Sequence, residues 1–243
     1  MKSIWLVRQT HGERHGLDRR SAREPLASLF YDVRHSVEFW QPAVIRQRKL
    51  AASVFGYELE GEPDFGLGRF TEGGEIQPYA VVMPSASRDD KLWPAEHWQR
   101  VFDRLARHGL GLRLLAGNDR ETERARQLVE GRPEAEVLSR LSRTEVARVL
   151  ASARLMVGLD SGLTHLSAGL GRPTIGIYKA STPVRTPLQG SSYTASLGER
   201  GSEPSAETVL SAVEQALAHD ADRTRSLKGL DGPEILAGQQ GLS

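Results

Sequence analysis

The chain has 243 residues, 39% of them hydrophobic and 26% charged, which is typical of a folded globular protein and excludes a disordered or fibrous one. It has no cysteine, which excludes disulfide bonds, thiolate metal sites and thiol-based catalysis. A net charge of +1 gives no general reason to expect nucleic-acid binding, and no apolar run approaches the ~20 residues of a membrane span. Arg8 interrupts the first apolar residues too early for a signal peptide, so the expected location is the cytoplasm.

Residues 1–50 form a basic segment at the start of the chain. They hold ten Lys and Arg against five Asp and Glu, a net charge of +5, whereas the remaining 193 residues hold 22 against 26. We expect this segment to be mainly helical and irregular, because no series of strand, loop and helix can be found in it. Its charge suits an anionic substrate or a membrane surface, and it equally suits a solvated helix face.

A regular alternation of strands and helices begins near residue 79. The expected strands are the short apolar runs 79–83, 112–116, 136–138, 155–159 and 174–178. The helices between them show apolar residues at three- and four-residue spacing, and Ser142 with Glu145 predicts a capping box at the start of one of them. A last helix is expected at 207–218. This pattern predicts a parallel sheet covered on both faces, which is a Rossmann-like α/β domain.

The composition also suggests where the domain ends. Residues 58–78 are rich in Gly, Glu and Pro without a sustained period, so we expect a linker there. Residues 221–243 contain many glycines and few apolar residues, which is typical of a disordered tail. The chain is therefore divided into an N-terminal segment at 1–57, the linker, a Rossmann-like domain at 79–220 and the tail.

Two polar clusters follow strands of the predicted domain. Asp160 to His165 reads Asp-Ser-Gly-Leu-Thr-His between a buried strand and a helix, where a helix N-terminus can bind phosphate. Ser85, Ser87 and Lys91 lie in the loop after the first strand, where hydroxyls and an ammonium suit a diphosphate. Both clusters are expected at the same edge of the sheet. Each could instead be a polar loop that only caps a helix.

Four stretches of the sequence resemble glycosyltransferase family 9, and within it the type I lipopolysaccharide heptosyltransferases. They are residues 15–31 (HGLDRRSAREPLASLFY), 88–98 (RDDKLWPAEHW), 145–150 (EVARVL) and 160–166 (DSGLTHL). The resemblance implies a GT-B fold, in which two Rossmann-like domains bind ADP-heptose and an acceptor made of Kdo-bearing lipid A. Residues 79–220 would be the complete C-terminal, donor-binding domain.

The resemblance also implies that the chain is a truncated form. Residues 1–57 would be what remains of the acceptor-binding domain, and the family's catalytic aspartate, in a glycine-rich loop, is expected upstream of Met1. The catalytic residue is therefore unassigned, and this form is expected to show little transfer. A further departure from the family is the loop 180–183, which reads Ala-Ser-Thr-Pro where the family has an acid after the threonine.

Site residues follow from the resemblance position by position. Ser87 and Lys91 would contact the diphosphate, Glu121 the ribose, and the backbone at Leu141 the adenine. The loop that binds the diphosphate and heptose would comprise Asp160, Ser161, Gly162, Leu163 and His165. The residues expected to bind the anionic acceptor are Arg23, Arg46 and Arg48. No metal and no cofactor is implied.

The implied reaction is the inverting transfer of heptose from ADP-heptose to a Kdo residue of the lipopolysaccharide inner core. The enzyme would be a cytoplasmic protein, peripheral to the inner membrane, and would not bind nucleic acid. Three alternatives stay open at this point: a type II lipopolysaccharide heptosyltransferase, a nucleotide-sugar epimerase of GT-B fold, and a non-catalytic remnant that only binds ADP.

Overall fold

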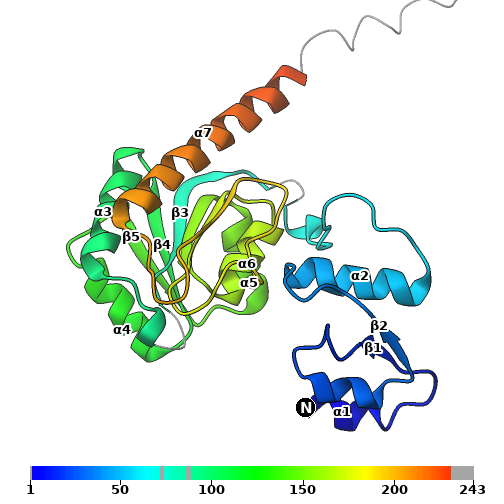
Figure 1. Ribbon diagram of the computed structural model, residues 1–243. Coiled ribbons are helices and arrows are strands. Elements are labelled where there is room, and N and C mark those ends of the chain that lie inside the picture. Colours follow the sequence, from blue (N-terminus) through cyan, green and yellow to red (C-terminus); the bar gives the residue numbers. More distant parts are fainter. Residues whose placement is uncertain (1, 72–73, 86–88, 231–243) are drawn as a thin grey trace, which may run out of the picture. The chain divides into compact units, whose positions relative to one another are not determined.

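The computed structural model describes residues 2–71, 74–85 and 89–230 (Figure 1). The backbone divides into two compact units. Unit 1 comprises Met1–Pro63 and Thr182–Pro187, and unit 2 comprises Asp64–Ser181 and Leu188–Ser243. In the described part of the chain, no helix combines the length and the apolar character needed to cross a membrane.

Unit 1 is small and contains a two-stranded parallel sheet. Its elements are helix α1 (Lys2–Val7), strand β1 (His15–Leu17), 3-10 helix η1 (Pro25–Phe30), strand β2 (Val33–His35) and helix α2 (Ala43–Phe55). The two strands pair in parallel, with His15 opposite Val33. The sequence did not predict them, because three-residue strands that contain histidine and arginine are too short and too polar to show an alternation.

Unit 2 is built on a six-stranded sheet in which every pair of neighbours is parallel. The strands are β3 (Gln77–Met83), β4 (Gly111–Ala116), β5 (Ala135–Ser139), β6 (Ala153–Leu159), β7 (Thr174–Ile177) and β8 (Thr194–Leu197). Their order is β5-β4-β3-β6-β7-β8. The chain thus runs outward from β3 in one direction and from β6 in the other, and ligands of such sheets bind at this switch point, outside the carboxyl ends of the strands.

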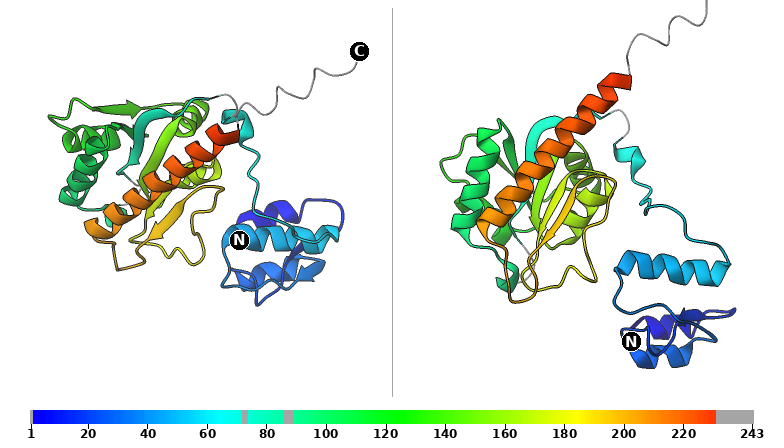
Figure 2. Two further views of the ribbon diagram at one scale, coloured as in Figure 1. Left: turned by 90° about the horizontal axis from the view of Figure 1, so that it is seen from above. Right: turned by 45° about the horizontal axis from the view of Figure 1, so that its top comes forward.

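Helices cover both faces of this sheet. They are η2 (Gly68–Phe70), η3 (Asp89–Lys91), α3 (Ala95–Arg107), α4 (Asp119–Leu128), α5 (Arg143–Ala151), α6 (Gly162–Gly169) and α7 (Ala206–Leu230). One face packs against α3, α4 and α7, and the other against α5 and α6. Figure 2 shows α7, in orange, lying across the sheet beside α3.

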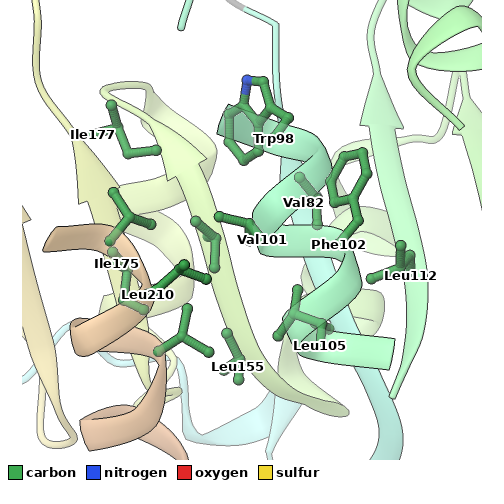
Figure 3. Close-up of a cluster of buried hydrophobic side chains, with 14 of the residues drawn as sticks. Val82, Trp98, Val101, Phe102, Leu105, Leu112, Leu155, Ile175, Ile177 and Leu210 are labelled. Carbon is green, nitrogen blue, oxygen red and sulfur yellow. The ribbon is translucent and has the colours of Figure 1, made fainter. Parts of the chain in front are cut away.

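The core is accordingly split into two clusters by the sheet. Along β3, Ala80 and Val82 belong to the cluster under α3 and α7, whereas Val81 and Met83 belong to the cluster under α5. Figure 3 shows part of the first cluster, in which Trp98 and other side chains of α3 gather with those of the strands and of α7. A strand buried on both faces reads as a continuous apolar run, which is why these strands could be predicted.

Two boundaries and one strand differ from the expectation. Unit 2 begins at Asp64, inside the expected linker, and Leu67 and Phe70 of that segment pack against the second cluster. Strand β8 was not predicted. Helix α7 continues ten residues beyond the expected boundary at 220 because Ala221–Lys228 contains good helix formers and neither proline nor glycine. Residues 231–243 of the expected tail lie outside the described part of the chain.

Candidate functional site

An ion pair joins the two predicted polar clusters at the switch point of unit 2. Lys91, at the end of η3, donates from Nζ to both the backbone carbonyl and Oδ2 of Asp160, each at 3.1 Å. Asp160 follows β6, and the loop that carries Lys91 follows β3, which is the neighbouring strand. The predicted convergence of the two loops is therefore confirmed. Both side chains are largely buried, with exposed fractions of 22% and 15%.

Asp160 is the centre of a wider polar network. Its Oδ2 accepts a hydrogen bond from the Ser181 hydroxyl, and its Oδ1 lies 3.5 Å from Nε2 of His165. Burial acts to raise the pKa of this carboxyl, but hydrogen bonds from His165, Ser181 and Lys91, together with the charge of the ammonium, outweigh it and hold the pKa well below its ordinary value. Asp160 therefore remains an anion at any physiological pH, and it holds the Lys91 ammonium in a fixed position.

The start of helix α6 is fixed by its own side chains. Ser161 is the N-cap and accepts a hydrogen bond from the Thr164 amide at 3.4 Å. Thr164 donates from its hydroxyl to the Leu159 carbonyl at 2.6 Å. A Cβ at position 158 would lie 2.8 Å from this hydroxyl, so Gly158 is what allows the helix to approach the end of β6. Gly162 is exposed in the first turn of α6, where backbone N–H groups have no acceptor within the helix.

An apolar pocket of about 290 Å³ lies on the β4 and β5 side of this centre. It brings together Leu141 and Leu163, two of the predicted donor residues that are distant in the sequence. Glu121 belongs to the same region, because its Oε2 accepts a hydrogen bond at 2.7 Å from the amide of Gly117, which lines the pocket. The pocket is lined by Leu115, Ala116, Gly117, Leu138, Leu141, Arg143, Val146, Leu163 and Leu166.

The predicted acceptor arginines lie in unit 1 and differ in their surroundings. Arg46 is buried and donates to the backbone carbonyls of Ser21 and Glu38, so its side chain holds the segment together. Burial, and then the charge of Arg185, lower the pKa of Arg46. Arg48 donates to the carbonyls of residues 60 and 61. Arg23 is exposed.

The sequence did not predict Ser181 as a residue of the site, and the structure does not test the prediction that Ser87 contacts the diphosphate. Ser87 lies outside the described residues, whereas Ser85 of the same cluster is fully buried at the end of β3. Ser181 could have been suspected from one signal, since it follows the strand next to β6 and so falls at the same edge as Asp160. Across the described ranges, no group of three or more potential metal ligands comes together.

Comparison with known proteins points to one family. The model of glycosyltransferase family 9 (heptosyltransferase) matches residues 1–214. Lipopolysaccharide heptosyltransferase 1 of Escherichia coli (strain K12) is 43% identical over 191 residues, a match that covers 75% of this chain and 59% of that protein. The chain thus spans less than two thirds of the length of this relative.

Solved structures agree with the sequence comparison. E. coli heptosyltransferase WaaC with ADP superposes with a TM-score of 0.80 at 38% identity, covering 88% of this chain and 69% of that one. The same enzyme with ADP-2-deoxy-2-fluoro heptose gives a TM-score of 0.77 at the same identity and coverage.

Proposed function

The chain belongs to glycosyltransferase family 9, the heptosyltransferase family, and on this premise we propose that it binds ADP-heptose in unit 2 and transfers the heptose to a Kdo residue of the lipopolysaccharide inner core. The observation that carries the proposal is the Lys91–Asp160 pair, which lies at the switch point where such sheets bind their ligands. The names of the similar proteins support the same donor, because the solved structures contain ADP and a fluorinated analogue of ADP-heptose.

The donor is proposed to lie along the carboxyl edge of the sheet. The apolar pocket next to Leu141 and Leu163 suits the adenine, since most of its lining side chains are leucine, valine and alanine. The Glu121 carboxylate, beside this pocket, suits a ribose hydroxyl. The diphosphate then falls between the Lys91 ammonium and the first turn of α6, where a cation and free amides are available. Ser87, Ser161, Gly162 and His165 belong to the same proposed contact set.

Lys91 is proposed to act on the leaving group. In an inverting transfer, the acceptor oxygen bonds to the anomeric carbon while the bond from that carbon to the donor phosphate oxygen breaks, and the acceptor proton passes to a base. The diphosphate gains charge as this bond breaks, so an ammonium that is already in place stabilises the transition state more than the ground state. Asp160 keeps Lys91 in that place and belongs to the loop proposed to bind the diphosphate and heptose.

The acceptor is proposed to be met by unit 1. Its basic segment suits the anionic Kdo-lipid A, and a lipid-linked acceptor requires an enzyme that works at the cytoplasmic face of the inner membrane as a peripheral protein. Arg23 is a better candidate for contact with the acceptor than Arg46, because the latter is buried against backbone carbonyls.

Two measurements test the proposal. Calorimetric titration should show binding of ADP, and weaker binding of UDP as the matched control, because the apolar pocket is proposed to select the base. Incubation with ADP-heptose carrying radiolabel in the sugar and with Kdo-lipid A should transfer only little label to the lipid, because no catalytic base is assigned in this chain. A chain that binds neither ADP nor ADP-heptose would refute the proposed function.

A further inference from the structure

A cavity of about 280 Å³, here called the α3–α4 cavity, lies between helices α3 and α4 of unit 2. Its size is close to the lower end of the ~300–1,000 Å³ that is usual for small-molecule sites. Trp93 and Leu128 of its lining belong to the core cluster under α3 and α7. Leu115 and Val146, which line the pocket proposed for the adenine, belong to the other cluster. The two pockets therefore lie on opposite faces of the sheet.

Trp98 lines the α3–α4 cavity and carries a hydrogen-bond donor that lacks an acceptor. The residue is 1% exposed, and its Nε1 has no partner among the described residues. Trp93, whose ring centre lies 5.1 Å away, instead donates from Nε1 to the Pro204 carbonyl at 2.9 Å. Figure 3 shows the nitrogen of Trp98 on the edge of the ring that faces away from Val101 and Phe102. Buried donors are nearly always paired, so a ligand oxygen would satisfy this one.

Arg124 gives the α3–α4 cavity a positive charge. None of the described residues that line it is acidic, and Arg124 is the charged one. The Arg124 side chain is 28% exposed and lies 3.7 Å from the carboxylate of Asp89, which forms a closer ion pair of 2.7 Å with Arg120. A guanidinium carries five N–H donors, so this long contact leaves donors for a ligand. Ala95 and Gln127 of the lining are exposed, so a ligand can enter from solvent.

We propose that the α3–α4 cavity binds a small aromatic carboxylate. The carboxylate pairs with the Arg124 guanidinium, whose fork matches two oxygens, and a ligand oxygen accepts from Nε1 of Trp98. The ring packs against the indoles of Trp93 and Trp98, since aromatic rings favour edge-to-face and offset contacts. One guanidinium balances one negative charge, which suits a carboxylate better than a phosphate. The inference goes beyond the proposed function, because no residue proposed to bind the donor or the acceptor lines this cavity.

The test uses 4-fluorobenzoate as the probe and follows the indole N–H signals of the four tryptophans by NMR of the full chain labelled with nitrogen-15. The Trp98 signal, assigned by its loss in Trp98→Phe, should shift and saturate at millimolar probe or below, whereas Trp40 of unit 1 should not shift. Arg124→Gln should weaken binding about tenfold or more, since it removes a charged partner. Arg126→Gln is the matched control and should stay within about twofold, because this exposed arginine of α4 does not line the cavity.

A second probe, 4-fluorobenzyl alcohol, keeps the ring and lacks the charge. It should bind the wild type about tenfold more weakly than 4-fluorobenzoate, and Arg124→Gln should leave its affinity unchanged. The inference is wrong if the Trp98 signal does not move at millimolar 4-fluorobenzoate, if the two arginine variants bind this probe equally, or if the alcohol binds as tightly as the carboxylate. None of these outcomes bears on ADP binding, so the proposed function is tested separately.

Discussion

Lys91 and Asp160 each compensate the charge of the other. Both are largely buried, so removing one leaves an uncompensated charge in a poorly solvated place. For Lys91 this has a second effect, because the carboxylate that remains would face the diphosphate of the proposed donor. Single variants at this pair therefore report more than the loss of one contact.

Lys91→Ala should weaken ADP binding by roughly ten- to hundredfold, the equivalent of one charge-assisted hydrogen bond of about 1.5–3 kcal/mol. Part of that loss comes from repulsion by the remaining Asp160 carboxylate. Adding Asp160→Asn to Lys91→Ala should thus recover some affinity, which calorimetric titration of the two single variants and the double variant measures. A double variant that binds ADP no better than Lys91→Ala would show that the pair does not act through charge.

The depressed pKa of Asp160 predicts a pH-dependent contribution to stability. Because the pKa is lower in the folded chain than in the unfolded one, the carboxylate stabilises the fold above about pH 4, and this contribution disappears as the pH falls towards the folded value. Urea unfolding at pH 7 and at pH 3 should show a larger gap between wild type and Asp160→Asn at pH 7. The other titrating acids are present in both proteins, so their contributions cancel when the two are compared at the same pH. An equal difference in unfolding free energy at both pH values would contradict the prediction.

Only those residues of the candidate site that follow an apolar strand could be predicted from the sequence. Lys91 and Asp160 each follow an apolar strand, and parallel strands place such residues at one edge, so their convergence could be derived from the sequence. The ion pair between Lys179 and Glu203, which line a cavity of about 660 Å³, could not be found in this way. Its two residues lie 24 positions apart and on either side of β8, a strand that the sequence did not reveal.

Among the helices and strands, the sequence predicted those strands whose apolar side chains are mostly buried. Strands β3 to β7 were located to within two residues at each end, and the capping box of α5 is present. Strand β8 reads Thr-Ala-Ser-Leu and is only partly buried, so it lacks the apolar run of its neighbours. The segment around Leu67 and Phe70 was assigned to a linker because two isolated apolar residues show no period, although they pack against the core.

The α5 capping box offers a test at this scale. Ser142 accepts a hydrogen bond from the Glu145 amide, and the Glu145 carboxylate accepts one from the Ser142 amide at 2.7 Å. Ser142→Ala should lower the free energy of unfolding by about 1 kcal/mol, since it leaves an amide of the first turn without its partner. Urea denaturation measures the change, with Ser142→Thr as the control that retains a capping hydroxyl. An unchanged midpoint in Ser142→Ala would mean that water replaces the cap at no cost.

For the whole molecule, the uneven distribution of charge predicts weak, salt-sensitive binding to anionic membranes. Arg19, Arg20 and Arg23 are exposed in unit 1, and their attraction to a charged surface is screened within ~10 Å at 0.1 M salt. Flotation with phosphatidylglycerol vesicles should therefore succeed at low salt and fail at about 0.5 M, where screening is stronger. Reversal of these three charges to Glu should abolish it.

The matched control for this experiment reverses three exposed arginines of unit 2, namely Arg107, Arg126 and Arg148. This control should bind vesicles more strongly than the unit 1 variant. Binding that salt does not weaken would indicate an apolar anchor instead, and equal loss in both variants would show that only net charge matters. Arg46 is unsuitable for such a test because its replacement disturbs the contacts that hold unit 1 together.

Unit 2 is interrupted in the chain, since residues 182–187, between β7 and β8, belong to unit 1. Lys91, Asp160 and Ser181 are synthesised before β8, which completes their sheet, and before α7, which packs against it. Helix α7 supplies buried residues such as Val209 and Val213, so until it emerges part of the face that also packs against α3 and α4 remains uncovered. At a synthesis rate of ~5–20 residues per second, that state lasts roughly 3–10 s. Chaperones that recognise exposed apolar surface should accordingly bind this chain after β7 is synthesised and before α7 emerges.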